Sequence, residues 1–146
     1  MNQGNFFIFS EHVKSVFAFL KEFNFDVVYA SLLKVRYESK DVYIEINHGE
    51  WDREVFITFG RIAKDEEFSF TLFLRLVNAL MEKSPGERLA DQPDEVCDCL
   101  TKRAKAMQKE GQSIMKGDNA VFEKMKDVRW WDFQPDALKE RFRKQG

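Results

Sequence analysis

Residues 33–46 read LKVRYESKDVYIEI, and the alternation of side chains in this stretch decides the fold class. Apolar residues take every second position up to Tyr37, and again from Val42 onward, which is typical of strands that bury one face. The connection at Ser39-Lys40 is short enough for a hairpin. We therefore expect two neighbouring antiparallel strands, at 33–38 and 42–46.

The flanking sequence extends this sheet on both sides. Alternation continues over 54–59, where Val55, Ile57 and Phe59 are the apolar positions, and 26–29 fits an additional edge strand. All connections among 33–59 are short. The sheet is therefore predicted to be an antiparallel meander of three to four strands.

Apolar residues with helical spacing occur before and after the predicted strands. An apolar stripe predicts a helix over 10–23, and Ser69 is a suitable N-cap for a second helix over 69–83. That second helix is apolar around most of its circumference, so we expect it between the sheet and the C-terminal helices. Further helices are predicted from about Asp94 to near Gly111, after an Asp118 cap that follows Gly117, and from Pro135.

Strands that are followed by helices, rather than alternating with them, indicate an α+β fold. The predicted order is an N-terminal helix, the meander sheet, and a C-terminal layer of three to four helices. Length, 44% hydrophobic residues and 15 Phe favour a single domain over 1–146. Ser84-Pro85-Gly86 is a candidate subdomain break near 84–92, whereas the apolar second helix favours a core that both parts share.

Composition narrows the classes of function. The N-terminus MNQGNFFIFSEH is not typical of a signal peptide, and no apolar run approaches the roughly 20 residues of a membrane span. Two cysteines cannot form a disulfide framework. We therefore expect a cytoplasmic protein without a membrane partner. The net charge of -2 also disfavours nucleic acid as a partner.

No motif for chemistry is present in a specific form. Cys97 and Cys99 are two residues apart on a predicted helix, and His12 and His48 lie far from each other, so a structural zinc site is not expected. One thiol should be packed and the other partly exposed. Nucleophile elbows and phosphate-binding glycine loops are missing. The sequence therefore predicts no catalytic residue, metal or cofactor, and favours a protein that is not an enzyme.

Charged residues of the central strands form the first candidate site. Arg36 and Glu38 share a strand face and can pair with Glu45 on the neighbouring strand. One interpretation is an ordinary solvated face, balanced by Arg36, Arg53 and Arg61. The alternative is a small-molecule or catalytic pocket built from Arg36, Glu38, Tyr43 and Glu45.

Tryptophans in polar surroundings form the second candidate site. His48, Glu50 and Trp51 lie in one polar hairpin, and Trp130-Trp131 is a second aromatic step. Exposed tryptophan beside charge favours contact with a partner protein, whereas a tryptophan folded over the core would be structural. A basic C-terminal helix with Lys139, Arg141, Arg143 and Lys144 either complements the helix dipole or contacts nucleic acid.

Several segments also resemble an uncharacterised family of small bacterial cytosolic α+β proteins. The similar strings are VRYESKDVYIEI, ITFGRI, SFTLFLRLVNAL and SIMKGDNAVFEKM, within 17–125, with matching positions at Arg36, Tyr37, Glu38, Ser39, Arg75, Gly117 and Asp118. The resemblance implies an immunity-type or accessory protein and no catalytic residue. The leading hypothesis is therefore a non-catalytic protein-binding, immunity- or inhibitor-like role.

Overall fold

The structure is a computed structural model that describes residues 9–49, 54–77 and 93–127. Within them, an N-terminal helix is followed by a five-stranded antiparallel sheet and then by the C-terminal helices, so the predicted α+β class is confirmed. The proposed break at 84–92 and the helix expected from Pro135 lie outside the described residues.

The sheet is the meander that the alternation predicts. Its strands are β1 (Asp26–Ala30), β2 (Lys34–Glu38), β3 (Val42–His48), β4 (Val55–Arg61) and β5 (Phe68–Ser69), in spatial order 1-2-3-4-5. Tyr37 lies opposite Ile44, and Arg36 lies opposite Glu45. The expected edge strand at 26–29 is present as β1, whereas the short β5 was not predicted.

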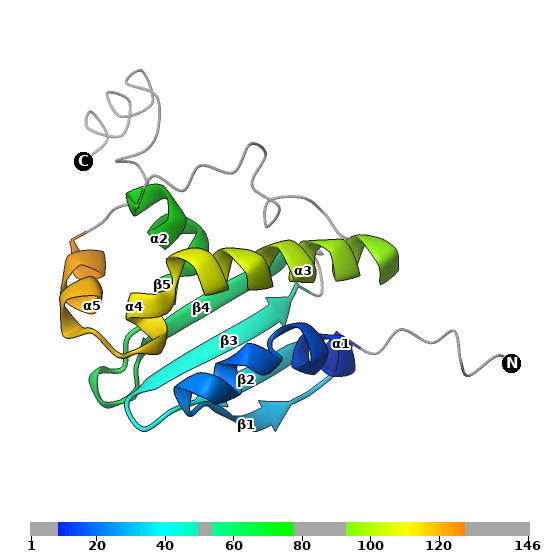
Figure 1. Cartoon of the computed structure of the whole chain (residues 1–146), viewed down its shortest axis with the longest axis horizontal. Helices are drawn as coiled ribbons and strands as arrows, with labels where there is room; N and C mark the ends of the chain where they lie inside the picture. Colours follow the sequence, from blue (N-terminus) through cyan, green and yellow to red (C-terminus); the bar gives the residue numbers. More distant parts are fainter. Residues whose placement is uncertain (1–8, 50–53, 78–92, 128–146) are drawn as a thin grey trace, which may run out of the picture.

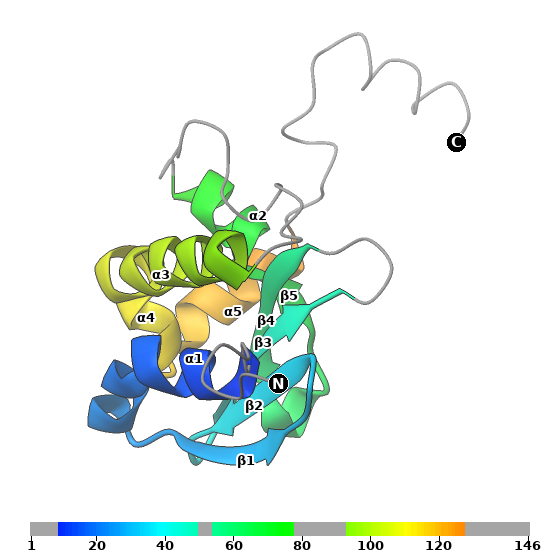
Figure 2. The ribbon, with the colours of Figure 1, turned by 90° about the vertical axis from the view of Figure 1, so that its right-hand side faces the viewer.

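Helices cover one face of this sheet (Figure 1). The predicted N-terminal helix is formed by α1 (Phe9–Val16) and the 3₁₀ helix η2 (Ala18–Phe23), which ends at Asn24 in the left-handed conformation. A second 3₁₀ turn, η3 (Ile62–Lys64), follows β4. The C-terminal part supplies α3 (Pro93–Glu110), α4 (Gln112–Met115) and α5 (Asn119–Lys126). Figure 2 shows this layer on one side of the edge-on sheet.

The helix α2 (Phe70–Leu76) begins at the predicted cap, because the Ser69 hydroxyl accepts a hydrogen bond from the Leu72 N–H at 3.2 Å. Its place differs from the expectation. α2 packs on β4 and β5, and α3 also contacts β4 directly, without α2 between them. Val77, the C-cap residue of α2, is exposed. The described part of α2 therefore lies beside the helical layer, not beneath it. Residues 78–83 of the predicted helix lie outside the described residues.

Local rules correctly placed the ends of the C-terminal helices. Gly111 follows the last residue of α3 and lies close to Met107. A Cβ atom at position 111 would lie only 2.8 Å from the Met107 carbonyl oxygen. Gly117 has a φ of 73°, which suits glycine after a helix. Asp118 then caps α5 by accepting a hydrogen bond from the Ala120 N–H at 3.0 Å.

A single core connects the parts of the chain before and after 78–92. The Phe59 ring on β4 lies 6.1 Å from the Phe73 ring on α2 and 6.0 Å from the Phe122 ring on α5. Phe17 beside α1 and Leu100 on α3 belong to the same buried cluster. The helical layer and the sheet are therefore stabilised by shared apolar burial.

Candidate functional site

Three residues of the predicted charged site are brought together on the sheet face opposite the helices. The Arg36 guanidinium donates to the Glu38 carboxylate and to the Glu45 carboxylate, each at 2.7 Å. Period two places Arg36 and Glu38 on one side of β2, and the register sets Glu45 opposite Arg36. This pairing was predicted from the sequence and is confirmed.

The same guanidinium stacks on an aromatic ring. Its central carbon lies 4.1 Å from the centroid of Tyr43, and the Tyr43 hydroxyl donates to the Glu66 carbonyl oxygen. Burial acts to lower the pKa of Arg36, but its hydrogen bonds to Glu45 and Glu38 outweigh this effect and raise it. Arg36 is therefore held firmly in its charged form.

The charges on this face neutralise one another. Lys34 lies 3.7 Å from Glu45, so two cations, Lys34 and Arg36, face two carboxylates, Glu38 and Glu45. Substrate sites need polar groups that are directed at the ligand, whereas these are directed at each other. This arrangement favours the interpretation of the cluster as a balanced surface.

Arg61 does not balance this face, and that part of the sequence interpretation is wrong. Its side chain lies on the helical side of β4, 5.3 Å from the centroid of Phe122. There it donates to Glu66 and, at 2.7 Å, to Glu123 on α5. The reason is its strand position, because Arg61 is an even number of residues from Phe59 and so shares the inward side.

The second predicted site is only partly described. His48 ends β3, is half-buried, and stacks on Phe9 with ring centroids 5.8 Å apart. Glu50, Trp51, Trp130 and Trp131 lie outside the described residues, as do Lys139, Arg141, Arg143 and Lys144 of the basic segment. The exposure of the tryptophans therefore stays a prediction.

The sequence did not single out an apolar strip along the edge strand β1. Every residue of β1 is exposed, and its Val28 and Tyr29 are 51% and 53% exposed. Val27 is also exposed, and Leu32 in the following bend is 84% exposed. We call Val27, Val28, Tyr29 and Leu32 the β1 strip. Its VVY composition is typical of a buried strand, so only its edge position reveals the exposure.

The edge is weakly protected against pairing. Natural edge strands are often guarded by lysine, proline or a bulge. β1 contains neither lysine nor proline, but its pairing with β2 shifts between Val27 and Tyr29, which is an irregularity of the bulge type. Short extended segments can therefore still align along its outer side.

Neither a metal site nor a membrane-spanning helix is found in the described residues. Across 9–49, 54–77 and 93–127, His, Cys, Asp and Glu side chains form no group of three that could hold a metal ion. Cys99 is buried and Cys97 is partly exposed, as predicted. In the same ranges, no helix has the length and apolar character that crossing a membrane requires.

No family model, curated protein or solved structure matches this chain.

Proposed function

We propose that this chain is a non-catalytic protein-binding module that receives an extended segment of another protein at β1. The observation that carries the proposal is the β1 strip. It places four large apolar side chains at one edge of the sheet, and three of them are about half-exposed or more. Burying such side chains against a partner is the usual source of binding energy at a protein interface.

The edge position selects the kind of partner. β1 is the first strand in the sheet order and pairs with β2 on one side. In the described part of the chain, no strand pairs with its other side. An incoming extended segment can take main-chain hydrogen bonds there and place alternate side chains against Val28, Tyr29 and Leu32. Because the register shifts within β1, we expect the added segment to be short.

The charged sheet face supports this function better than it supports catalysis. Its carboxylates and cations are paired with each other at 2.7 Å to 3.7 Å. An immunity- or inhibitor-type role, in which the bound protein is a toxin, is the form of this proposal that the sequence resemblance implies. Such a role requires a stable docking surface and no reacting group on this chain.

Substitution of the β1 strip tests the proposal. Proteins that the full chain retains from a cell extract in gentle salt are identified, and one of them is purified. Its affinity is then measured by titration for wild type, Val28→Lys and Leu32→Lys. Both side chains are exposed, so their replacement should change stability little. We expect each lysine to weaken binding of the purified partner at least about tenfold, because hot-spot residues contribute 2 kcal/mol or more.

Val77→Lys is the matched control, because Val77 is also an exposed valine but lies at the end of α2. It should leave the affinity unchanged. Equal binding by wild type, Val28→Lys and Leu32→Lys would contradict the proposal. So would light scattering that shows a wild-type dimer that Val28→Lys dissociates, because the strip would then be occupied by a second copy of this chain.

A further inference from the structure

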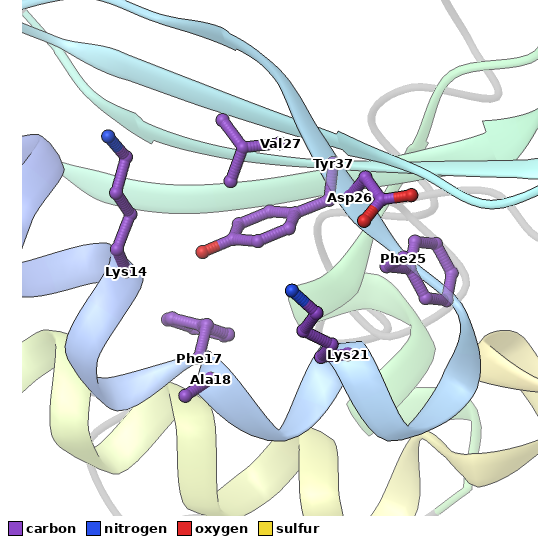
Figure 3. Close-up of a pocket in the computed structure, with 8 residues that line it drawn as sticks. All are labelled: Lys14, Phe17, Ala18, Lys21, Phe25, Asp26, Val27 and Tyr37. Carbon is purple, nitrogen blue, oxygen red and sulfur yellow. The ribbon is translucent and has the colours of Figure 1, made fainter.

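A separate feature lies on the helical side of the same sheet edge. A pocket of about 250 Å³ opens between α1, η2 and the β1–β2 hairpin. Phe17 and Phe25 supply an apolar lining, and Lys14, Lys21 and Asp26 are exposed residues around it (Figure 3). This pocket is distinct from the charged face, which lies on the other side of the sheet.

Tyr37 gives the pocket an unused hydrogen-bonding group. Its side chain is 5% exposed, and its hydroxyl oxygen is buried without a hydrogen-bond partner. Figure 3 shows the Tyr37 ring extending from β2 into the space between Lys14, Phe17 and Lys21. A buried hydroxyl without a partner is unfavourable by about 1–3 kcal/mol, so such groups are uncommon in folded proteins.

The charges around the pocket favour an anion. Lys14 and Lys21 contribute two ammonium groups and Asp26 one carboxylate, so the lining carries a formal charge of 2 − 1 = +1. Lys14 also lies 3.5 Å from Glu11, and the two side chains are 41% and 66% exposed, so this pair is weak and readily exchanged. Lys21 stands on η2 at the opposite end of the lining helices.

The apolar lining defines the rest of the ligand. Ala18 and the 41% exposed Val27 offer open apolar surface, and the rings of Phe17 and Phe25 lie buried beneath it, so a hydrocarbon body would pack here better than a bare inorganic anion. Since one water occupies about 30 Å³ in the liquid, 250 Å³ has room for a compact ligand of roughly eight to ten non-hydrogen atoms. An empty packing defect would be lined by apolar groups alone, whereas this pocket contains a phenol and two lysines.

We propose that this pocket binds a small carboxylate with an apolar body, of the size of an aromatic acid or a medium-chain fatty acid. Lys14 and Lys21 neutralise the charge of the carboxylate, and the hydrocarbon part packs on Ala18 and Val27 above Phe17 and Phe25. The buried Tyr37 hydroxyl donates a hydrogen bond to the carboxylate when the side chains that cover it move aside. Burial raises the pKa of Tyr37 to about 12, so the phenol is a donor throughout the neutral pH range. This proposal does not rest on the proposed protein-docking function, although Val27 belongs both to the pocket lining and to the β1 strip.

Titration of the full chain with defined probes tests the pocket. Sodium benzoate and sodium octanoate are compared with benzamide, which lacks the charge, and with inorganic phosphate, which lacks the apolar body. Binding is followed by calorimetry and by backbone amide shifts in ¹H–¹⁵N spectra. We expect saturable binding of at least one carboxylate, with shifts centred on 14–27 and Tyr37, and much weaker responses to benzamide and phosphate.

Three variants assign the binding to named groups. Tyr37→Phe removes only the hydroxyl and should weaken carboxylate binding about tenfold, because the lost hydrogen bond is to a charged group. Lys21→Gln should weaken it about threefold, as expected for a solvent-exposed charge pair. Tyr29→Phe, at an exposed tyrosine on β1, is the matched control and should bind as wild type does.

Three results would overturn the proposal. One is the lack of saturable binding by either carboxylate at millimolar concentration. The second is binding that Tyr37→Phe and Lys21→Gln leave unchanged, and the third is amide shifts that lie elsewhere in the chain. The Val28→Lys and Leu32→Lys variants, whose residues do not line the pocket, should still bind the carboxylate. Failure of this proposal and failure of the docking proposal are therefore distinguishable.

Discussion

At the scale of single residues, Tyr37 and Tyr43 form an informative pair. They occupy neighbouring strands, both are more than nine-tenths buried, and burial is the main cause that raises the pKa of each to about 12. Their hydroxyls differ, because Tyr43 donates to the Glu66 carbonyl and Tyr37 donates to no acceptor. The same chemical group is thus stabilising on one face of the sheet and unfavourable on the other.

Opposite effects on stability should follow from the same substitution at these two positions. We expect Tyr37→Phe to raise the free energy of unfolding by about 1 kcal/mol, because a buried hydroxyl without a partner is removed. Tyr43→Phe should lower it by about 1 kcal/mol, because the Glu66 carbonyl loses its donor. Urea denaturation measures both. If Tyr37→Phe destabilises as much as Tyr43→Phe does, the Tyr37 hydroxyl has a partner in solution.

At the scale of elements, Arg61 joins three parts of the fold. It stands at the end of β4, donates to Glu66 just before β5, and donates to Glu123 on α5. The hydrogen bond from Arg61 is the first cause of the lowered pKa of both Glu66 and Glu123. A carboxyl with a lowered pKa in the folded state stabilises the fold only while it is ionised.

Acid should therefore weaken the connection between β4 and α5. Both carboxylates titrate, in the folded state, below the ordinary glutamate value of about 4.3, so their contribution is complete above that pH and disappears as pH falls through the lowered values. We expect Glu66→Gln to be less stable than wild type at neutral pH and to lose less stability on acidification. Thermal unfolding from neutral pH to pH 3 tests this.

Glu67→Gln is the control, since Glu67 is the neighbouring residue and is exposed. It should follow the wild-type stability curve closely. A Glu66→Gln curve that runs parallel to wild type over the acid range would show that the Arg61 pairing does not set the acid sensitivity.

At the scale of the whole molecule, the helical layer and the sheet share one core. Leu100 on α3 and Ile44 on β3 are both fully buried within it. The segment 78–92 that separates these parts in sequence therefore does not separate two cores among the described residues. Cooperative unfolding is the physical consequence of such shared burial.

Truncation of Leu100 should destabilise the sheet as well as α3. We expect Leu100→Ala to lower the free energy of unfolding by about 2–5 kcal/mol, and residue-resolved NMR during urea unfolding should give one midpoint for α3 and for β3. Lys105→Ala, at an exposed position of α3, should change stability by less than about 0.5 kcal/mol. An α3 that unfolds well before β3 would contradict the shared core.

Features with a local physical cause were predictable from the sequence. Period-two alternation placed β2, β3 and β4 and set Arg36 and Glu38 on one side, so their pairing with Glu45 followed from a hairpin register. The Ser69 and Asp118 caps and the turn at Gly117 are likewise made by residues within a few positions of one another. The α+β order needed no more than these signals.

The sequence by itself therefore determined the longer helices and strands, their order and the pairing of Arg36, but not the short η3, β5 and α4. Only the tertiary structure decided that α2 lies beside the helical layer, that Arg61 faces α5, that β1 exposes Val28 and Tyr29, and that Tyr37 projects into a pocket beneath α1. The physical reason is burial. Whether an apolar strand or a phenol is buried depends on elements that are distant in the chain. A local sequence pattern therefore cannot predict how much of such a side chain is exposed.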